Sequence, residues 1–393
     1  MKTVYVDNNA TTQVAPEVVE AMLPYFSEFY GNPSSMHFFG GQVQKKINEA
    51  REKVADFLGA EPSEIVFTSC GTESDNAAIF GTLDSYPEKR HFITSRVEHP
   101  AVMNVVAHLN RKGYRTTEIS VDREGHLDMD QLKESITEET VLVSVMYANN
   151  ETGVIFPIEE IGQIVKSQGV PFHTDAVQAA GKIPLNMKRS TVDMLSLSGH
   201  KLHAPKGIGV LYIRKGTKFS PFMIGGHQEK GRRGGTENVP YIIGLGEACE
   251  LAKKHLEEEN TRVRALRDYL EAKILEKIPN TLINGDRRSR LPNTLSVSFE
   301  YVEGESILLL LSDLGICASS GSACTSGSLE PSHVLRAMGV PFTAAHGSVR
   351  FSLSIYNTKE EMDYIIEHLP PIIQKLRDIS PFWKDYLKSQ RTG

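Results

Sequence analysis

Short apolar runs alternate with amphipathic stretches through the first two thirds of the chain. Between the runs, residues 43–58 repeat apolar side chains at the spacing of one helical face. Strands that alternate with helices predict an α/β fold with a mostly parallel sheet, covered by helices on both faces. Such sheets bind ligands beyond the carboxyl ends of their strands, so we expect the functional residues there. The runs that we expect to form strands are residues 65–68, 91–95, 141–146, 171–174, 192–197 and 208–213.

The pattern changes after this region. Residues 244–278 form one long, charged, amphipathic stretch, which predicts a helix of the kind that bridges domains. We therefore expect a large domain at residues 13–258 and a small domain made of residues 1–12 and 259–393. The small domain reads as α+β, with strands at 293–299 and 348–354 and helices at 304–314 and 358–377.

Composition narrows the class of protein. Of the 393 residues, 40% are hydrophobic and 23% are charged, which is ordinary for a globular protein. The net charge of −6 argues against nucleic-acid binding, and no apolar run is long enough to span a bilayer. The first residues do not read as a secretory signal, and the 4 cysteines do not form a disulfide framework. We expect a cytoplasmic protein, in a reducing compartment, with no nucleic-acid or membrane partner.

Lys201 follows an apolar run, in the sequence Ser198-Gly199-His200-Lys201. A lysine at the end of a buried strand is well suited to form a Schiff base. Most lysines are solvated surface residues, and that is the competing interpretation. Ser198 and His200 favour the functional interpretation, because both side chains suit a phosphate group. Lys206 is the alternative lysine, but its Pro-Lys-Gly setting predicts a turn.

Cys324 lies in a run of small residues, 319–328, which reads Ser-Ser-Gly-Ser-Ala-Cys-Thr-Ser-Gly-Ser. We expect it on a mobile loop, about residues 318–332, from which its thiol can reach a bound substrate as a nucleophile. Free cysteines are also commonly small buried hydrophobes, which better describes the other cysteines of this chain.

Two further side chains follow strand-like runs. Asp175 is either the cap of a helix or a functional carboxylate. Near a Schiff-base lysine, a carboxylate would keep the pyridine nitrogen of pyridoxal phosphate protonated, which makes the ring an electron sink. His99, just before Pro100, is either a helix cap or a residue that stacks on a ring and carries protons.

Two glycine-containing segments are candidates for binding phosphate. Gly71 and Thr72 stand where a strand turns into a helix, and free backbone N–H groups there bind anions, although ordinary capping by Thr72 explains the same residues. Residues 225–236 are Gly-rich and basic, which is typical of a solvated loop or of one ordered by a neighbouring subunit or a phosphate. His200 and His203 do not read as a metal site, because they lie at a strand turn with no third ligand nearby.

Four motifs, taken together, carry a clear resemblance to one family. They are Ala-Asn149-Asn150-Glu-Thr-Gly, Phe-His-Thr-Asp175-Ala-Val-Gln178, Ser-Gly-His200-Lys201 and Ser-Ser-Gly-Ser-Ala-Cys324-Thr-Ser. In these motifs the chain resembles the cysteine desulfurases, which are fold-type I pyridoxal-phosphate enzymes of the class V aminotransferase kind. The likeness extends from Val6 to Pro381 and is greatest to the nitrogen-fixation (NifS) type. In one departure, Ile355 stands where the family usually has a basic residue.

The resemblance implies a fold-type I transferase, with a large, mostly parallel, seven-stranded sheet domain and a smaller C-terminal α+β domain. It implies pyridoxal 5′-phosphate as the cofactor. Lys201 would hold the cofactor as a Schiff base and take the α-proton of the substrate. Asp175 would pair with the pyridine nitrogen, while His99 would stack on the ring and shuttle protons. Gln178 and Asn150 would contact the cofactor's phenolic oxygen and the substrate.

The resemblance also implies the remaining ligands and partners. Arg350 would bind the carboxylate of L-cysteine, and Cys324 would take the sulfur as a persulfide, leaving L-alanine. An iron–sulfur scaffold protein would accept the sulfur, for nitrogenase or for general cluster assembly, and Cys324 would hold a transient iron–sulfur cluster. The enzyme would be a homodimer. The phosphate would be held by Gly71, Thr72, Ser198 and His200, with Thr236 reaching in from the second subunit.

Three alternatives stay open at this point. A selenocysteine lyase or another β-eliminating enzyme of the same fold would use the same lysine and aspartate without needing Cys324. A pyridoxal-phosphate aminotransferase would release no sulfur. A scaffold for an iron–sulfur cluster would bind it through cysteines, but the cysteines of this chain are too scattered to favour that function.

Overall fold

The computed structural model describes residues 3–320 and 330–391. Cys324 lies outside the described residues, as does most of the small-residue run around it. In the described part, no helix is both long enough and apolar enough to cross a membrane.

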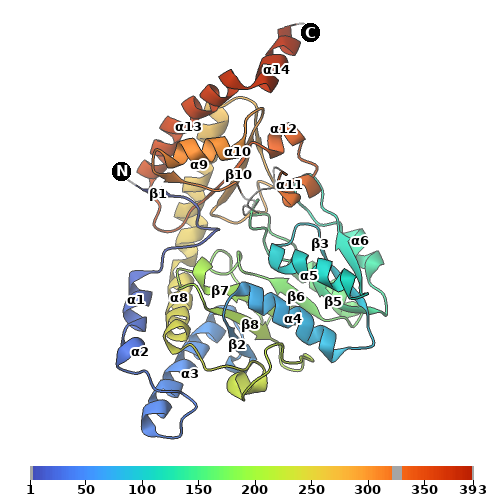
Figure 1. Ribbon diagram of the computed structural model, residues 1–393, viewed down its shortest axis with the longest axis vertical. Coiled ribbons are helices and arrows are strands. Elements are labelled where there is room, and N and C mark those ends of the chain that lie inside the picture. The colour runs from blue at the N-terminus through green and yellow to red at the C-terminus, as the bar shows by residue number, and fades with distance from the viewer. Residues whose placement is uncertain (1–2, 321–329, 392–393) are drawn as a thin grey trace.

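A seven-stranded sheet forms the larger part of the molecule (Figure 1). Neighbouring strands are parallel except at β8, which runs antiparallel to both of its neighbours. The mostly parallel sheet is therefore confirmed, together with all the strands expected from the apolar runs. Its order is β2 (Ile65–Thr68), β8 (Gly209–Ile213), β7 (Met194–Ser198), β6 (Phe172–Asp175), β5 (Thr140–Ser144), β3 (His91–Ser95) and β4 (Arg115–Ile119).

β4 is the strand of this sheet that the hydrophobic pattern did not predict. It reads Arg-Thr-Thr-Glu-Ile, and of these residues only Ile119 is buried. β4 forms an edge of the sheet and pairs with β3 alone. Because an edge strand has a side open to solvent, it needs no continuous apolar run, and the sequence signal for it is weak.

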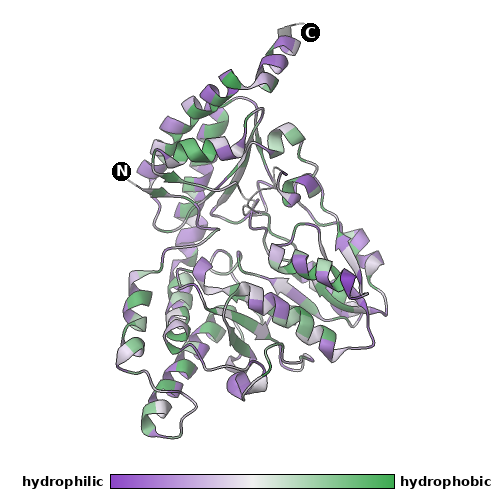
Figure 2. Cartoon of the chain, viewed as in Figure 1, coloured by the Kyte–Doolittle hydropathy of each residue, from purple (hydrophilic) through white to green (hydrophobic). Residues whose placement is uncertain are grey.

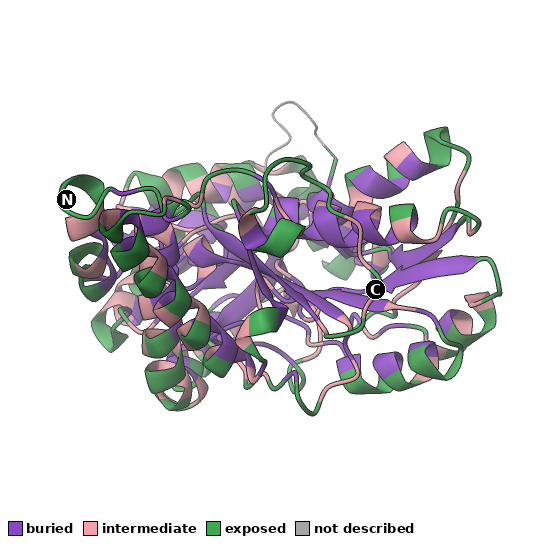
Figure 3. Ribbon diagram, turned by 90° about the horizontal axis from the view of Figure 1, so that it is seen from below, coloured by how far each residue is buried: buried purple, intermediate pink, exposed green. Residues whose placement is uncertain are grey.

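Helices cover both faces of the sheet. α4 (Gly71–Ser85) and α5 (Pro100–Arg111) pack on one face, and α3 (Phe38–Leu58), α7 (Ile158–Ser167) and α8 (Val239–Glu258) pack on the other. Phe92 belongs to the first core and Ile93, the next residue, to the second, because successive strand side chains point to opposite faces. Burial on both faces explains why the strands are continuous apolar runs, hydrophobic in Figure 2 and enclosed in Figure 3.

The smaller unit is built on an antiparallel sheet in the order β12 (Ser348–Ser352), β10 (Thr294–Phe299) and β9 (Thr281–Ile283). α9 (Arg264–Lys277), α10 (Gly304–Ser312) and α13 (Lys359–Ile379) pack into a core of its own. Val4 and Val6 lie in this core, and β1 (Val4–Tyr5) pairs parallel with β11 (Ile316–Cys317). The first residues of the chain thus pack with its last third. The remaining helices are α1 (Pro16–Met22), α2 (Pro24–Ser27), α6 (Met129–Ser135), α11 (His333–Ala337), α12 (Phe342–Ala345) and α14 (Pro381–Arg391).

The long helix expected at residues 244–278 is not continuous. α8 ends at Glu258, a π-helical turn occupies Glu259–Val263, and α9 follows directly. Glu259 in this turn is buried and accepts a hydrogen bond of 2.5 Å from Lys182. Single π-helical turns of this kind interrupt the regular hydrogen-bond ladder of a helix. The apolar pattern predicted the helices on either side but carries no signal for the break.

Gly347, just before β12, offers a test of the packing in the smaller unit. A Cβ atom there would lie 2.0 Å from the carbonyl oxygen of Phe299, so the backbone would have to shift. We expect Gly347→Ala to lower the free energy of unfolding by about 1–3 kcal/mol, as overpacking does. Gly41→Ala in α3 is the control, since nothing lies within 4 Å of that position. Urea unfolding measures the free energy of unfolding of both variants. A Gly347→Ala protein as stable as wild type would contradict the described contact.

Candidate active site

A pocket of about 1120 Å³ lies between the carboxyl ends of the central strands and the smaller unit. Two residues expected at the site are not part of its described lining. Thr236 lies elsewhere on the surface, and Cys324 is outside the described residues. All the other expected residues line the pocket, namely Gly71, Thr72, His99, Asn150, Asp175, Gln178, Ser198, His200, Lys201 and Arg350.

Lys201 ends a short 3-10 helix, Gly199–Lys201, that follows β7 directly. Its ammonium donates to the carbonyl oxygens of Asn9 at 2.5 Å and of Ala10 at 2.7 Å. Burial and the positive charge of Arg350 lower the pKa of Lys201 to about 8. At pH 7 about a tenth of such an amine is neutral, a far larger share than in an ordinary lysine, and the neutral form is the nucleophile.

Asp175 closes β6 and faces the pocket. Its Oδ1 accepts from the backbone N–H of Val177 at 2.9 Å, but this bond closes a turn, and the next element after β6 is β7, so the helix-cap interpretation of this residue is wrong. Burial raises the pKa of Asp175 to about 6, and the hydrogen bond from Val177 and the charge of Lys201 oppose that rise. A cationic partner at this point would therefore stabilise the carboxylate strongly.

Asp75 is a pocket residue that the sequence did not single out. It lies in α4 with 1% of its surface exposed, and its Oδ1 has no hydrogen-bond partner among the described residues. Nε2 of His173 lies 3.7 Å from this oxygen. Burial, reinforced by the charge of Asp175, raises the pKa of Asp75 well above its ordinary value. Nothing in the hydrophobic pattern distinguishes this acid from an ordinary polar residue of a helix.

His99 caps a helix and also lines the pocket. It is the N-cap of α5, where its Nδ1 accepts from the backbone N–H of Ala101 at 3.1 Å, and its ring also lines the pocket. Burial, with the charges of Lys201 and His333, lowers the pKa of His99 to about 4. A neutral imidazole whose Nδ1 accepts must carry its hydrogen on Nε2. His99 therefore offers the pocket a hydrogen-bond donor.

The start of α4 forms a cradle for an anion. Gly71 is its first residue, and a Cβ atom there would lie 2.8 Å from Val177 and 3.4 Å from Ser198, so a larger side chain would fill the space. The buried hydroxyl of Ser198 has no hydrogen-bond partner among the described residues. An unused donor beside free N–H groups at a helix start suits a phosphate. His200 adjoins it, with Nδ1 at 3.2 Å from the hydroxyl of Thr11.

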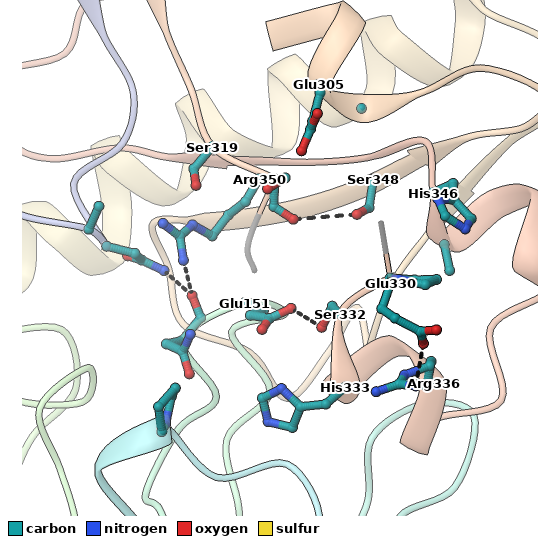
Figure 4. Close-up of a pocket in the computed structure, with 18 of the residues that line it drawn as sticks. Glu151, Glu305, Ser319, Glu330, Ser332, His333, Arg336, His346, Ser348 and Arg350 are labelled. Carbon is teal, nitrogen blue, oxygen red and sulfur yellow. Dashed lines mark hydrogen bonds and ion pairs between the residues drawn. The ribbon is translucent and has the colours of Figure 1, made fainter. Parts of the chain in front are cut away.

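Arg350, on β12, forms the opposite wall of the pocket (Figure 4). Its guanidinium donates to Asp7 Oδ1 and to the carbonyl oxygen of Asn150, both at 2.8 Å. The buried Nε has no partner among the described residues, so the group still has donors to offer a carboxylate. The sequence did not identify Asp7, Asn9 or Ala10 as parts of the site, because they lie in a segment without periodic pattern.

The Gly-rich basic segment is anchored by its own chain. Glu229 forms an ion pair with Arg51 at 2.7 Å, and Arg233 pairs with Glu73 at 2.8 Å in the first turn of α4. Two ion pairs within the chain therefore tie this segment to α3 and α4. Thr236 itself is exposed.

The described residues also bear on metal binding. No group of metal-ligating side chains occurs within residues 3–320 and 330–391. The expected transient iron–sulfur cluster involves Cys324, which lies outside those residues. The chemistry that the described pocket supports is that of a reactive amine, a buried carboxylate, a neutral histidine and an anion cradle, which together suit a phosphorylated carbonyl cofactor.

Comparison with known proteins identifies the class. The family described as Aminotransferase class-V matches residues 4–365. A "Cysteine desulfurase" from Trichormus azollae is 62% identical over 98% of this chain and 96% of that protein, and "Cysteine desulfurase NifS" from Azotobacter vinelandii is 58% identical over the same shares. A solved "NIFS-LIKE PROTEIN" is 42% identical with a TM-score of 0.90, covering 95% of this chain and 100% of that one.

The chain therefore belongs to the class-V aminotransferase family. Within that family it is similar to the cysteine desulfurases, as the motifs in its sequence indicated. The fold class and pyridoxal 5′-phosphate as the cofactor are confirmed by the same findings.

The lowered pKa of Lys201 predicts how the amine responds to pH. We expect the covalent attachment of pyridoxal phosphate to the apoenzyme to accelerate as the pH rises and to level off above about pH 8, because the neutral amine is the reactive form. Borohydride reduction and mass spectrometry of the labelled peptide measure the rate. Lys206→Ala, the competing lysine, should retain attachment, and Lys201→Ala should lose it. Acceleration that continues toward pH 10.5 would contradict the effect of burial.

Proposed function

We propose that this protein is a cysteine desulfurase, which removes sulfur from L-cysteine with pyridoxal 5′-phosphate, releases L-alanine and carries the sulfur on Cys324 as a persulfide. The observation that carries the proposal is the single pocket in which Lys201, Asp175, His99 and Arg350 meet. Relatives named cysteine desulfurase, at 53–62% identity over 98% of the chain, support the choice of substrate.

In this proposal the cofactor is held at both ends. Gly71, Thr72, Ser198 and His200 bind its phosphate in the cradle at the start of α4, and Thr236 of a second subunit completes it. Asp175 pairs with the pyridine nitrogen. A positive charge there would favour the ionised form of this carboxylate, which burial disfavours. His99 would stack on the ring, and Gln178 and Asn150 would bind near its phenolic oxygen. When bound, the cofactor supplies an electron sink next to the substrate's α-carbon.

The substrate is oriented by charge. The free donors of Arg350 bind the carboxylate of L-cysteine, and Asp7 and the carbonyl oxygen of Asn150 keep the guanidinium in place. Lys201, with its pKa lowered to about 8, takes the α-proton at Nζ. His99 donates from Nε2. The smaller unit thus positions the substrate, and the large sheet positions the groups that move protons.

The sulfur step uses Cys324. Its thiolate attacks the substrate sulfur, the bond between carbon and sulfur breaks, and the electron pair of that bond is protonated on carbon to give alanine. The sulfur atom remains on Cys324 as a persulfide. We propose an iron–sulfur scaffold protein as the acceptor, in nitrogenase maturation or general cluster assembly, with a transient cluster on Cys324. We also propose that the enzyme works in the cytoplasm.

We propose a homodimer as the working form. Large apolar side chains are exposed around the N-terminal helices and the Gly-rich segment, and burial against a second copy would remove them from water. The segment that ends in Thr236 is held to α4 by the ion pair of Arg233 with Glu73. Examples of the exposed side chains are Leu23 at 59%, Phe26 at 55%, Tyr30 at 72%, Phe38 at 78% and Ile224 at 90%.

Replacing the proposed sulfur carrier tests the function. We expect Cys324→Ala to keep the visible absorbance of bound pyridoxal phosphate and to release alanine and sulfide from L-cysteine at least about 100-fold more slowly than wild type, because the nucleophile is gone. Cys317→Ala is the matched control and should retain turnover. A fully active Cys324→Ala enzyme would favour a lyase of the selenocysteine or β-eliminating kind, and release of a keto acid without sulfide would favour an aminotransferase.

The proposed phosphate cradle predicts the effect of a single hydroxyl. We expect Ser198→Ala to weaken the binding of pyridoxal phosphate by roughly 10- to 100-fold, because a hydrogen bond to a charged group contributes about 1.5–3 kcal/mol. The stability of the apoprotein should stay unchanged, since that hydroxyl has no partner there among the described residues. Titration of the apoenzyme with pyridoxal phosphate measures the affinity, and urea unfolding of the apoprotein measures the stability. The exposed Ser167→Ala is the control for both measurements. Unaltered affinity would place the phosphate elsewhere.

A further inference from the structure

His333 is a pocket residue to which no role has been given so far. It is the first residue of α11 and lines the pocket on the side shown in Figure 4. The preceding Ser332 is buried and caps this helix by accepting from the backbone N–H groups of Val334 and Leu335. The hydroxyl of Ser332 in turn donates to the buried carboxylate of Glu151. The start of α11, and with it the base of the His333 side chain, is therefore fixed.

The tautomer of His333 follows from its hydrogen bond. Its Nε2 lies 2.9 Å from the main-chain carbonyl oxygen of Glu98. A carbonyl oxygen only accepts, so Nε2 carries the hydrogen, and the neutral ring has its lone pair on Nδ1. Nδ1 forms no hydrogen bond with any residue in the described ranges. The pocket thus contains an imidazole nitrogen that is free to accept a proton.

His99, which donates a proton in the proposed mechanism, has no free nitrogen that could accept one. His99 uses Nδ1 to accept the N–H of Ala101 and therefore presents Nε2–H to the pocket. The two rings are close enough for the charge of His333 to lower the pKa of His99. Of these two histidines, His99 is therefore arranged to donate a hydrogen bond and His333 to accept a proton.

A buried carboxyl group lies next to the start of α11. Glu151 is only 4% exposed and accepts a hydrogen bond from the hydroxyl of Ser332, the residue before His333. The charged or titratable groups around His333 are Glu98, His99, Glu151, Arg350 and, on its own helix and the residues before it, Glu330 and Arg336.

We propose that His333 is a further catalytic acid–base residue, whose Nδ1 accepts the proton of a thiol in the pocket. The S–H bond breaks, its electron pair stays on sulfur as a thiolate, and an N–H bond forms at Nδ1. The imidazolium returns the proton to the thiolate of the acceptor or to water when the cycle closes. The thiol is that of L-cysteine bound in the pocket. The inference rests on the proposed desulfurase function and adds the base that this function needs.

The decisive variant is His333→Gln. Its side-chain amide can still donate to the Glu98 carbonyl but cannot take up a proton. We expect kcat to fall by about 100-fold, in the range of general-base catalysis, with pyridoxal phosphate absorbance and the KM for L-cysteine retained. The decline of kcat on the acid side of the pH profile should change, since the imidazole of His333 is no longer there to accept a proton. His108→Gln, on α5 outside the pocket, is the control.

A second variant distinguishes the loss of the base from misfolding of the protein. His333→Ala should be equally slow and should recover activity when imidazole is added, because the added base can occupy the vacated space. Wild-type kcat and an unchanged pH profile in both variants would overturn the proposal. If wild type itself released no alanine from L-cysteine, the desulfurase function would fail, and that outcome is separate from the failure of His333 alone.

A further measurement identifies the thiol. L-selenocysteine should restore the rate of His333→Gln, because a selenol ionises without a base. A variant that stays slow with L-selenocysteine and does not respond to imidazole would overturn the proposal.

Discussion

The site depends on placing a lysine amine out of water without giving it a carboxylate partner. The ammonium of Lys201 is held by the carbonyl oxygens of Asn9 and Ala10, which stabilise it less than an anion would. Burial therefore prevails over the attraction of Asp7 and Asp175, and the pKa falls to about 8. A carboxylate in direct contact would have kept the amine charged and unreactive. The sheet supplies the burial, and the segment before α1 supplies neutral acceptors.

Buried acids whose ionisation is suppressed lie in and next to the same pocket, with Asp75 and Asp175 in its lining and Glu98 adjacent to His99. Burial raises the pKa of Asp175 to about 6 and of Glu98 to about 8, and it raises that of Asp75 as well. Each of these groups makes ionisation of the next one harder. A cationic ligand would relieve this repulsion, so the free energy stored in desolvated acids favours the binding of a protonated ring. The fold thus prepares an electrostatic environment before any ligand arrives.

Hydrophobic periodicity predicted much of the fold, because strands buried on both faces must be apolar throughout. It failed at β4 and β9, which are edge strands of their sheets, and at the π-helical turn Glu259–Val263, which leaves the apolar spacing unchanged. At the site, motif chemistry predicted the residues that follow strands, such as Lys201 and Asp175. It missed Asp7, Asp75 and His333, whose importance comes from neighbours distant in sequence. A hydrogen bond such as that of His333 to the Glu98 carbonyl leaves no local pattern.

Because the first residues of the chain pack with its last third, the site around Lys201 is completed late in synthesis. The backbone N–H of Asn8 donates to the carbonyl oxygen of Ser352, and the side-chain amide of Asn9 donates to the hydroxyl of Thr294. The carbonyl groups that hold Lys201 belong to the same segment, so they reach their final places only after nearly the whole chain has left the ribosome. During synthesis the central sheet can form while its lysine is still solvated and charged. Completion of the chain, rather than folding of the large sheet, is therefore the event that makes the amine reactive.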